Sequence, residues 1–189
     1  MKALGKSALV VTLLVTGLAG CASVPKSEAK RNVLQDDAEA ALATMEANDD
    51  SLKPLVQNAY GYAVFPTIGE GGFVVGGAHG LGVVYQQGRM IGYVELNQAS
   101  IGAQLGGKSF SELLLFSGPA PLESLKSGKL TFGADASAIA VTAGAGAQAR
   151  FQHGVAAFVM PKGGLMANLS VSGQEITYTQ AYGGSGGAH

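Results

Sequence analysis

Residues 102–109 read GAQLGGKS and match the phosphate-binding loop pattern G-x-x-x-x-G-K-[ST]. In loops of this type the backbone N–H groups cradle the phosphates, the lysine reaches the terminal phosphates and the hydroxyl binds Mg²⁺. Nucleotide-hydrolysing enzymes also use an Asp at the end of an apolar strand, whereas Asp135 follows Phe132-Gly-Ala rather than a buried run. We therefore expect no nucleotide hydrolysis and no bound nucleotide.

Lys108 and Ser109 have a simpler candidate chemistry. The apolar block 113–116 predicts a buried helix over residues 109–116, because four adjacent apolar residues cover every side of a helix. At the N-terminus of such a helix, free N–H groups and the helix dipole favour a phosphate, including that of a lipid head group. The alternative interpretation is a structural turn without a ligand.

Four further cations fall at the ends of predicted strands or helices: Lys126, Lys129, Arg150 and Lys162. If those ends converge in the fold, the four side chains form a basic rim that attracts anionic lipid head groups. The alternative is a set of scattered, solvated surface charges.

Catalytic and metal-binding patterns are not indicated elsewhere. The histidines at 79, 153 and 189 share no ligand spacing with the cysteine or with acidic clusters. The G-x-S-x-G sequence of the chain, at 183–187, lies in the Gly-rich tail and not between a predicted strand and a helix. The paired carboxylates at 36–37 and 49–50 lie in or beside a solvated helix face, where helix polarity and capping account for them. We expect a protein that is not an enzyme, with no catalytic residue, no metal site and no cofactor.

The N-terminal segment has the pattern of a bacterial lipoprotein signal. Lys2 and Lys6 precede a twelve-residue apolar run, 8–19, which is shorter than the roughly 20 residues of a transmembrane helix. The run ends in Leu-Ala-Gly followed by Cys21, the only cysteine of the chain. In lipoproteins that this segment resembles, the thiol receives a diacylglycerol and the chain is cut before the cysteine. The alternative is an ordinary cleaved signal. We predict a removed signal over 1–20 and a lipidated N-terminus and linker over 21–30.

Composition and the residue after Cys21 suggest a location. Ala22 stands where an Asp tends to retain related lipoproteins at the inner membrane, so we expect the outer membrane, facing the periplasm. Without Lys2 and Lys6 the chain has 10 basic and 13 acidic residues, a net charge of −3. A mildly acidic chain is not expected to bind nucleic acid, which usually requires a basic surface.

Periodicity places helices first and strands afterwards. An apolar stripe that includes Val33 and Leu34 predicts a helix over 31–48, followed by a short helix over 51–58. Alternation from Tyr60 onward predicts strands, with another helical turn near 121–127. The strands are expected over 62–65, 73–75, 81–85, 90–96, 129–132, 134–149, 151–160, 165–172 and 175–178.

Most glycines lie in the region where strands are predicted, since 26 of the 29 come after Tyr60. Gly at alternate positions of a strand, as at Gly144 and Gly146, indicates bends or close backbone approach. We predict an α+β fold: N-terminal helices packed on a strongly curved, mostly antiparallel, partly closed β-sheet with a short helical insertion.

Several short motifs occur in one order along the chain. They are YGYAVFP at 60–66, GGFVVGG at 71–77, GAQLG at 102–106, ELLLF at 112–116, KLTFGAD at 129–135 and KGGL at 162–165. In series these motifs resemble the SYLF domain, also described as a lipid- or actin-binding domain of endocytic proteins. The resemblance extends over 31–182 and leaves 183–189 as a flexible Gly-rich tail. Bacterial members are commonly secreted lipoproteins.

The resemblance implies a non-catalytic domain that binds phospholipid. Together with Cys21 it predicts a lipid-anchored envelope protein whose partner is the phospholipid membrane. Candidate head-group contacts are Lys108, Ser109, Lys126, Lys129, Arg150 and Lys162. The alternative is an envelope protein-interaction or scaffolding module that uses the membrane only as an anchor.

Overall fold

The computed structural model describes residues 24–72, 75–101, 108–130, 132, 137–163, 171 and 173–181. Cys21, the predicted signal segment and the Gly-rich tail lie outside these residues. The described helices are α1 (Glu28–Asn48), α2 (Leu52–Asn58), α3 (Pro119–Lys126) and the 3₁₀ turn η1 (Gly146–Gln148). The described strands are β1 (Gly61–Gly72), β2 (Val75–Gln86), β3 (Arg89–Ile101), β4 (Lys108–Phe116), β5 (Ile139–Ala140), β6 (Val155–Lys162) and β7 (Gln174–Gln180).

The strands form one seven-stranded sheet in the order β5-β6-β4-β1-β2-β3-β7. All neighbours are antiparallel except β5 and β6, which are parallel. The predicted α+β class is therefore confirmed, whereas the predicted strong curvature and partial closure are wrong. The described edge strands β5 and β7 do not pair, and Gly144 and Gly146, which suggested curvature, lie in a turn and in η1 instead of a strand.

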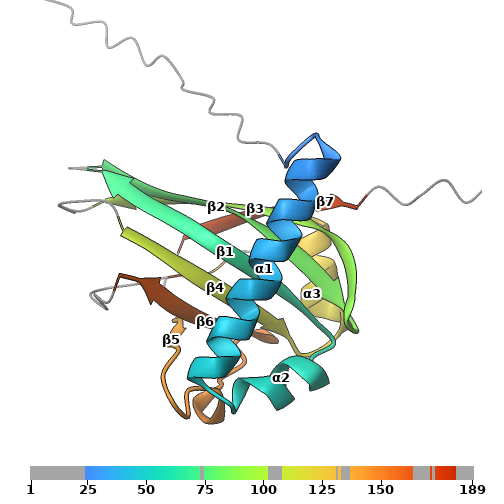
Figure 1. Cartoon of the computed structure of the whole chain (residues 1–189), viewed down its shortest axis with the longest axis vertical. Helices are drawn as coiled ribbons and strands as arrows, with labels where there is room; N and C mark the ends of the chain where they lie inside the picture. Colours follow the sequence, from blue (N-terminus) through green and yellow to red (C-terminus); the bar gives the residue numbers. More distant parts are fainter. Residues whose placement is uncertain are drawn as a thin grey trace, which may run out of the picture.

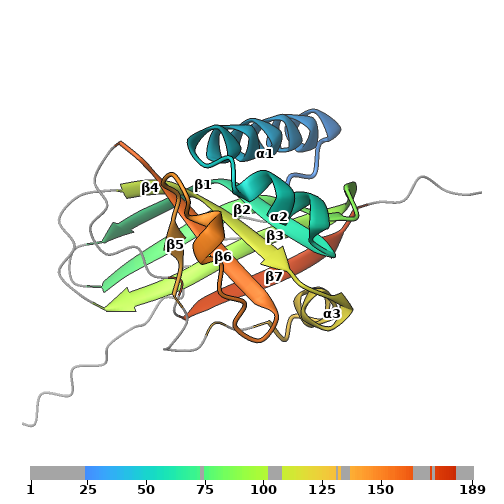
Figure 2. The same cartoon turned by 90° about the horizontal axis from the view of Figure 1, so that it is seen from below.

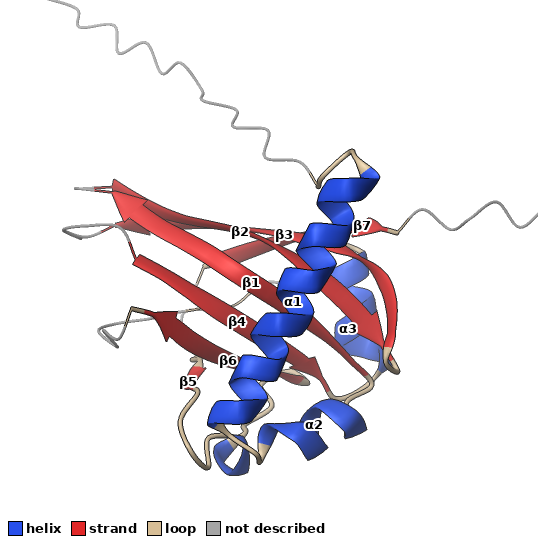
Figure 3. Cartoon of the chain, viewed as in Figure 1, coloured by secondary structure: helices blue, strands red, loops and turns tan. Residues whose placement is uncertain are grey.

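Helix α1 crosses one face of the sheet, and α3 lies on the opposite face (Figures 1 and 2). Figure 3 shows that α2 connects the end of α1 to the start of β1. Ser27 begins α1 by accepting a hydrogen bond from the Lys30 backbone N–H at 3.4 Å, so the helix starts earlier than residue 31. Ala38, Ala41 and Met45 are buried against the sheet.

Val33 was expected on the buried apolar face of the first helix, but its side chain is 58% exposed. Among the described residues, no helix combines the length and apolar character needed to cross a membrane.

Strand β4 corrects the predicted helix over 109–116. Leu113 and Leu115 pack in the core beneath α1 and α2, and Leu114 and Phe116 pack in the core on the α3 side. The segment reads as continuously apolar because β4 lies inside the sheet and both of its faces are buried. Of the two helical segments expected within the strand region, only the turn near 121–127 is present, as α3, which follows β4 directly and buries Leu122 and Leu125.

Other predicted strands also changed. The strand expected to stop at Pro66 continues as β1, because a register shift between Val64 and Thr67 accommodates the proline. The strand expected over 134–149 is reduced to β5 among the described residues. Residues 129, 130 and 132 are not in a strand, and most of the strand expected over 165–172 lies outside the described residues.

Candidate functional site

The candidate cations of the sequence divide between two ends of the sheet. At the end where β4 begins, which we call the Lys108 end, Ser109 pairs in register with Lys162 of β6. The Lys162 ammonium donates a hydrogen bond to Thr67 Oγ1 at 2.6 Å. The sheet thus brings together Lys108, Ser109 and Lys162, which are far apart in sequence.

The proposed helix N-terminus at Ser109 is wrong. Lys108 and Ser109 open strand β4, and the backbone N–H groups of a strand point sideways to its neighbours. Ser109 pairs with Gly69 on one side and with Lys162 on the other. Neither a helix dipole nor a set of free N–H groups is therefore available for a phosphate at this position.

Lys126 and Lys129 lie at the opposite end, where β1 begins, which we call the Gln86 end. Lys126 Nζ forms an ion pair with Glu123 at 2.9 Å and donates to Gln86 Oε1 at 3.4 Å. Lys129 is exposed directly after α3, and its backbone N–H donates to Ser124. Arg150 is exposed after η1, near the α1–α2 junction. The predicted single basic rim does not form, because these cations and those of the Lys108 end are separated by the length of the strands.

The structure also shows cations that the sequence reading did not single out. Arg89 is the register partner of Gln86, the residue whose Oε1 accepts a hydrogen bond from Lys126. Three more, Lys26, Lys30 and Arg31, lie in and just before the first turn of α1. The signal for them was present as KSEAKR at 26–31, three cations within six residues.

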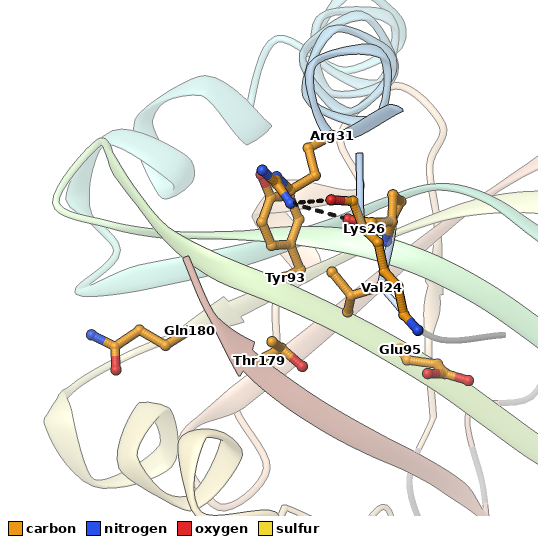
Figure 4. Close-up of a pocket in the computed structure, with 8 residues that line it drawn as sticks. Val24, Lys26, Arg31, Tyr93, Glu95, Thr179 and Gln180 are labelled. Atoms are coloured by element: carbon orange, nitrogen blue, oxygen red, sulfur yellow. Dashed lines mark hydrogen bonds between the residues drawn. The ribbon is translucent and has the colours of Figure 1, made fainter. Parts of the chain in front are cut away.

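A groove of about 620 Å³ lies between the start of α1 and the β3–β7 side of the sheet. Arg31 Nη1 donates to the carbonyl of Lys26 at 2.9 Å and to that of Pro25 at 3.4 Å, as Figure 4 shows. Gln35 Nε2 donates to the Tyr93 hydroxyl at 2.8 Å and ties α1 to β3. The groove is lined by Val24, Pro25, Lys26, Arg31, Tyr93, Glu95, Thr179 and Gln180.

Asp49 is buried although the sequence placed it beside a solvated face. Its carboxylate accepts hydrogen bonds from the backbone N–H and the hydroxyl of Ser51, at 3.1 and 2.7 Å. It also accepts from the N–H groups of Gly144 and Gly146, at 3.0 and 2.6 Å. Burial alone would raise the pKa of Asp49, but these hydrogen bonds together hold it below its usual value. Asp49 joins the α1–α2 junction to the loop around η1.

Glu112 is completely buried on the α3 side of β4. Its Oε2 accepts a hydrogen bond from Gln174 Nε2 at 2.9 Å, whereas Glu112 Oε1 and Gln174 Oε1 have no partner. Burial raises the pKa of Glu112 to about 7, and the Gln174 bond opposes that rise. A protonated Glu112 would place a hydroxyl donor beside the free Gln174 oxygen, so that both orphaned oxygens would be satisfied.

The part of the chain that the structure describes holds no cluster of three or more His, Cys, Asp or Glu residues that could bind a metal ion. His79 Nδ1 lies 3.1 Å from Asn97 Oδ1 and 3.9 Å from Glu95 Oε1, at the surface of the sheet.

Residues 97–182 match the family model Ysc84, described as Las17-binding protein actin regulator. This segment is therefore similar to the Ysc84/SYLF family. The Ysc84/SYLF domain is associated with lipid and actin binding, and the family is generally non-catalytic. No curated protein matches the chain. The resemblance seen in the sequence is thus confirmed over 97–182, while its motifs at 60–66 and 71–77 precede the matched segment.

The Ysc84/SYLF match covers all six candidate head-group residues, from Lys108 to Lys162. The three cations at the start of α1 precede it, together with the groove residues Val24 and Pro25. The matched strands β4, β6 and β7 therefore pack with elements supplied by the first half of the chain.

Proposed function

We propose that the protein is a lipid-anchored envelope protein, attached through Cys21 at the outer membrane and facing the periplasm. Its Ysc84/SYLF domain would bind anionic phospholipid and catalyse no reaction. The observation that carries the proposal is the match to a lipid-associated family in a chain whose only cysteine ends a lipoprotein-type signal.

Surface charge supports the lipid-binding part of the proposal. Lys129, Arg150 and Lys162 are exposed and stand at ends of elements. Each cation near an anionic membrane surface contributes about 1 kcal/mol, so separate small groups of cations give weak, salt-sensitive binding. Stable attachment would come from the acyl chains, since each buried CH₂ contributes about 0.8 kcal/mol.

Vesicle flotation tests the domain without its anchor. The chain lacking residues 1–20 and carrying Cys21→Ser is mixed with vesicles of phosphatidylglycerol and phosphatidylcholine, or of phosphatidylcholine alone. We expect flotation with the anionic vesicles at low salt and release at high salt. A protein that stays at the bottom of the gradient with both vesicle types would refute lipid binding by the domain.

A second candidate function is a protein-interaction module that needs the membrane only as an anchor. It is favoured by the family description, which names Las17 and actin regulation for the family. The same soluble protein, immobilised and exposed to envelope extract, discriminates between the two. Recovery of one stoichiometric protein together with no flotation would support the interaction module.

A further inference from the structure

The two edges of the sheet differ in length. One edge is β5, which has only two residues, and the other is β7, which has seven and follows β3 as the last strand (Figure 2). A short edge strand offers few free backbone groups to another chain. The β7 edge has no such protection.

The backbone groups of β7 alternate between β3 and the open edge. Ala181, directly after β7, donates its N–H to the Ile91 carbonyl. Because an antiparallel ladder bonds every second residue to the same neighbour, the odd-numbered residues from 175 to 181 bond to β3. The even-numbered residues therefore point their N–H and C=O groups outward. Within the described part of the chain, no other element forms a backbone hydrogen bond with the outward groups of Ile176, Tyr178 and Gln180.

The sequence of β7 also lacks the residues that discourage edge pairing. QEITYTQ contains no Pro, no Gly and no Lys, and residues 176–179 are all β-branched or aromatic. Glu175 is the only charged residue of the strand, and it is exposed together with Thr177 and Thr179. A long edge of this composition is a template for pairing with another strand.

We infer that β7 pairs with β7 of a second copy of this chain, antiparallel and centred on Thr177, so that two sheets join across a two-fold axis. This register pairs the strand over its whole length, 174 with 180 and 176 with 178. The outward groups of Ile176 then bond to those of Tyr178 of the second copy, and their side chains form a β-branched–aromatic pair.

The charges of the strand fit this register. Glu175 lies opposite the neutral Thr179 of the second copy. The two Glu175 carboxylates are then about 14 Å apart along the strands, beyond the Debye length at physiological salt. The pairing therefore opposes no like charges.

The joined sheet has a defined arrangement of helices. Residues that pair across an antiparallel ladder point to the same face of the sheet. The α1 helices of the two copies therefore lie on one side of the joined sheet, and both α3 helices lie on the other. The contact is between protein copies, and it requires neither lipid nor an anchor at Cys21.

Cysteine cross-linking tests the register. The chain lacking residues 1–20 and carrying Cys21→Ser has no cysteine. In this background Thr177→Cys places two thiols at the two-fold axis, with Cβ atoms about 5 Å apart. Glu175→Cys is the matched control on the same face, because its two thiols are about 14 Å apart, too far for a disulfide.

With oxidised glutathione as the oxidant, we expect severalfold more disulfide-linked dimer from Thr177→Cys than from Glu175→Cys on a non-reducing gel. A mixture of Glu175→Cys chains and Thr179→Cys chains should cross-link again, since these two positions face each other. Equal cross-linking of Thr177→Cys and Glu175→Cys would overturn the register.

Sedimentation equilibrium tests the contact without a cross-link. Gln180→Pro removes an outward N–H and no bond to β3, whereas the control Gln180→Ala keeps this N–H. We expect Gln180→Pro to raise the dimer dissociation constant about 30-fold, because each copy loses one hydrogen bond worth roughly a fivefold factor. Gln180→Ala should change it less than threefold. Equal dissociation constants for the two variants would argue against the pairing.

The thermal unfolding midpoints of the two dilute Gln180 variants show whether Gln180→Pro is folded, and if it is not, the cysteine variants decide. A soluble chain that sediments as a monomer at every concentration would overturn the inference. That result leaves the proposed lipid binding intact, because vesicle flotation tests it separately.

Discussion

Glu112 and Gln174 form a buried pair from strands that are not neighbours in the sheet. One hydrogen bond of 2.9 Å joins them, and one oxygen of each side chain is left without a partner. A carboxylate at this position would be a buried charge stabilised by a single neutral donor, which is unfavourable. A carboxylic acid is neutral and supplies the missing donor, so protonation favours the folded state.

This pair predicts a pH dependence of stability. Because the pKa of Glu112 is raised from 4.5 to about 7, the folded state binds its proton more tightly than the unfolded state. The free energy of unfolding should therefore fall as the pH rises from about 4.5 through 7, by up to about 3 kcal/mol. Glu112→Gln should flatten this part of the curve in urea unfolding measured between pH 4.5 and 8. An unchanged slope in the variant would contradict the assignment.

Asp49 is also buried, but unlike Glu112 it favours the charged form, because its carboxylate accepts four hydrogen bonds. Asp49→Asn replaces one acceptor oxygen with a donor and leaves a buried N–H of Gly144 or Gly146 unsatisfied. We expect a loss of about 2 kcal/mol in the free energy of unfolding. The control is Asp50→Asn, because the Asp50 carboxylate is exposed and forms a surface ion pair with Lys53; this variant should change stability much less than Asp49→Asn. Equal losses in both variants would contradict the role given to Asp49.

At the scale of elements, the glycines of β1 and β2 have different roles. A Cβ on Gly82 would lie 2.6 Å from the Val64 carbonyl oxygen and 2.8 Å from the Phe65 ring. The Phe65 side chain is fully buried and packs over this position, so Gly82 lets an aromatic side chain lie against the neighbouring strand. A Cβ on Gly69 meets nothing within 4 Å.

This contrast predicts opposite effects of the same substitution. Gly82→Ala should lower the free energy of unfolding by about 1–3 kcal/mol, because the added methyl group overpacks the core. Gly69→Ala should leave stability unchanged or raise it by about 0.5–1 kcal/mol, because alanine restricts the unfolded chain. Thermal unfolding of the two variants is the measurement, and a destabilised Gly69→Ala would show that its open surroundings are wrongly described.

Strand β4 shows why some elements could not be predicted. A run of apolar residues reports burial on all sides, and both a core helix and a central strand satisfy it. The decision depended on β1 and β6, which pair with β4 from positions far away in sequence. By contrast, α1 was predictable because its own periodicity, with polar residues on the outer face, is specific to a helix.

At the scale of the whole molecule, the proposed acyl anchor and the proposed lipid-binding domain would make separable contributions to membrane association. Two acyl chains on Cys21 would give attachment that salt does not reverse, whereas head-group contacts weaken with salt. We expect the native chain to stay in the membrane pellet after a high-salt wash and Cys21→Ser to be released. Retention of Cys21→Ser in washed membranes would argue against an acyl anchor.

The candidate site was only partly predictable for the same physical reason. Residue types identified the cations, but their grouping depends on which strand ends meet. Lys162 lies beside Ser109 because β6 pairs with β4, and Lys126 lies beside Gln86 because α3 folds back over the start of β1. The three cations at 26–31 were visible in the sequence, yet only the tertiary structure shows that Arg31 binds the carbonyls of Pro25 and Lys26.

The sequence by itself determined the local properties of this protein. These are the Cys21 signal pattern, the order of helices before strands, the α+β class and the SYLF resemblance, all of which depend on neighbouring residues. Only the tertiary structure decided that β4 is a central strand, that the sheet stays open, and that Asp49 and Glu112 are buried with partners 97 and 62 residues away. A buried polar side chain needs a hydrogen-bond partner, but that partner can come from any distance along the chain. The identity of the partner is therefore not encoded in a local sequence pattern.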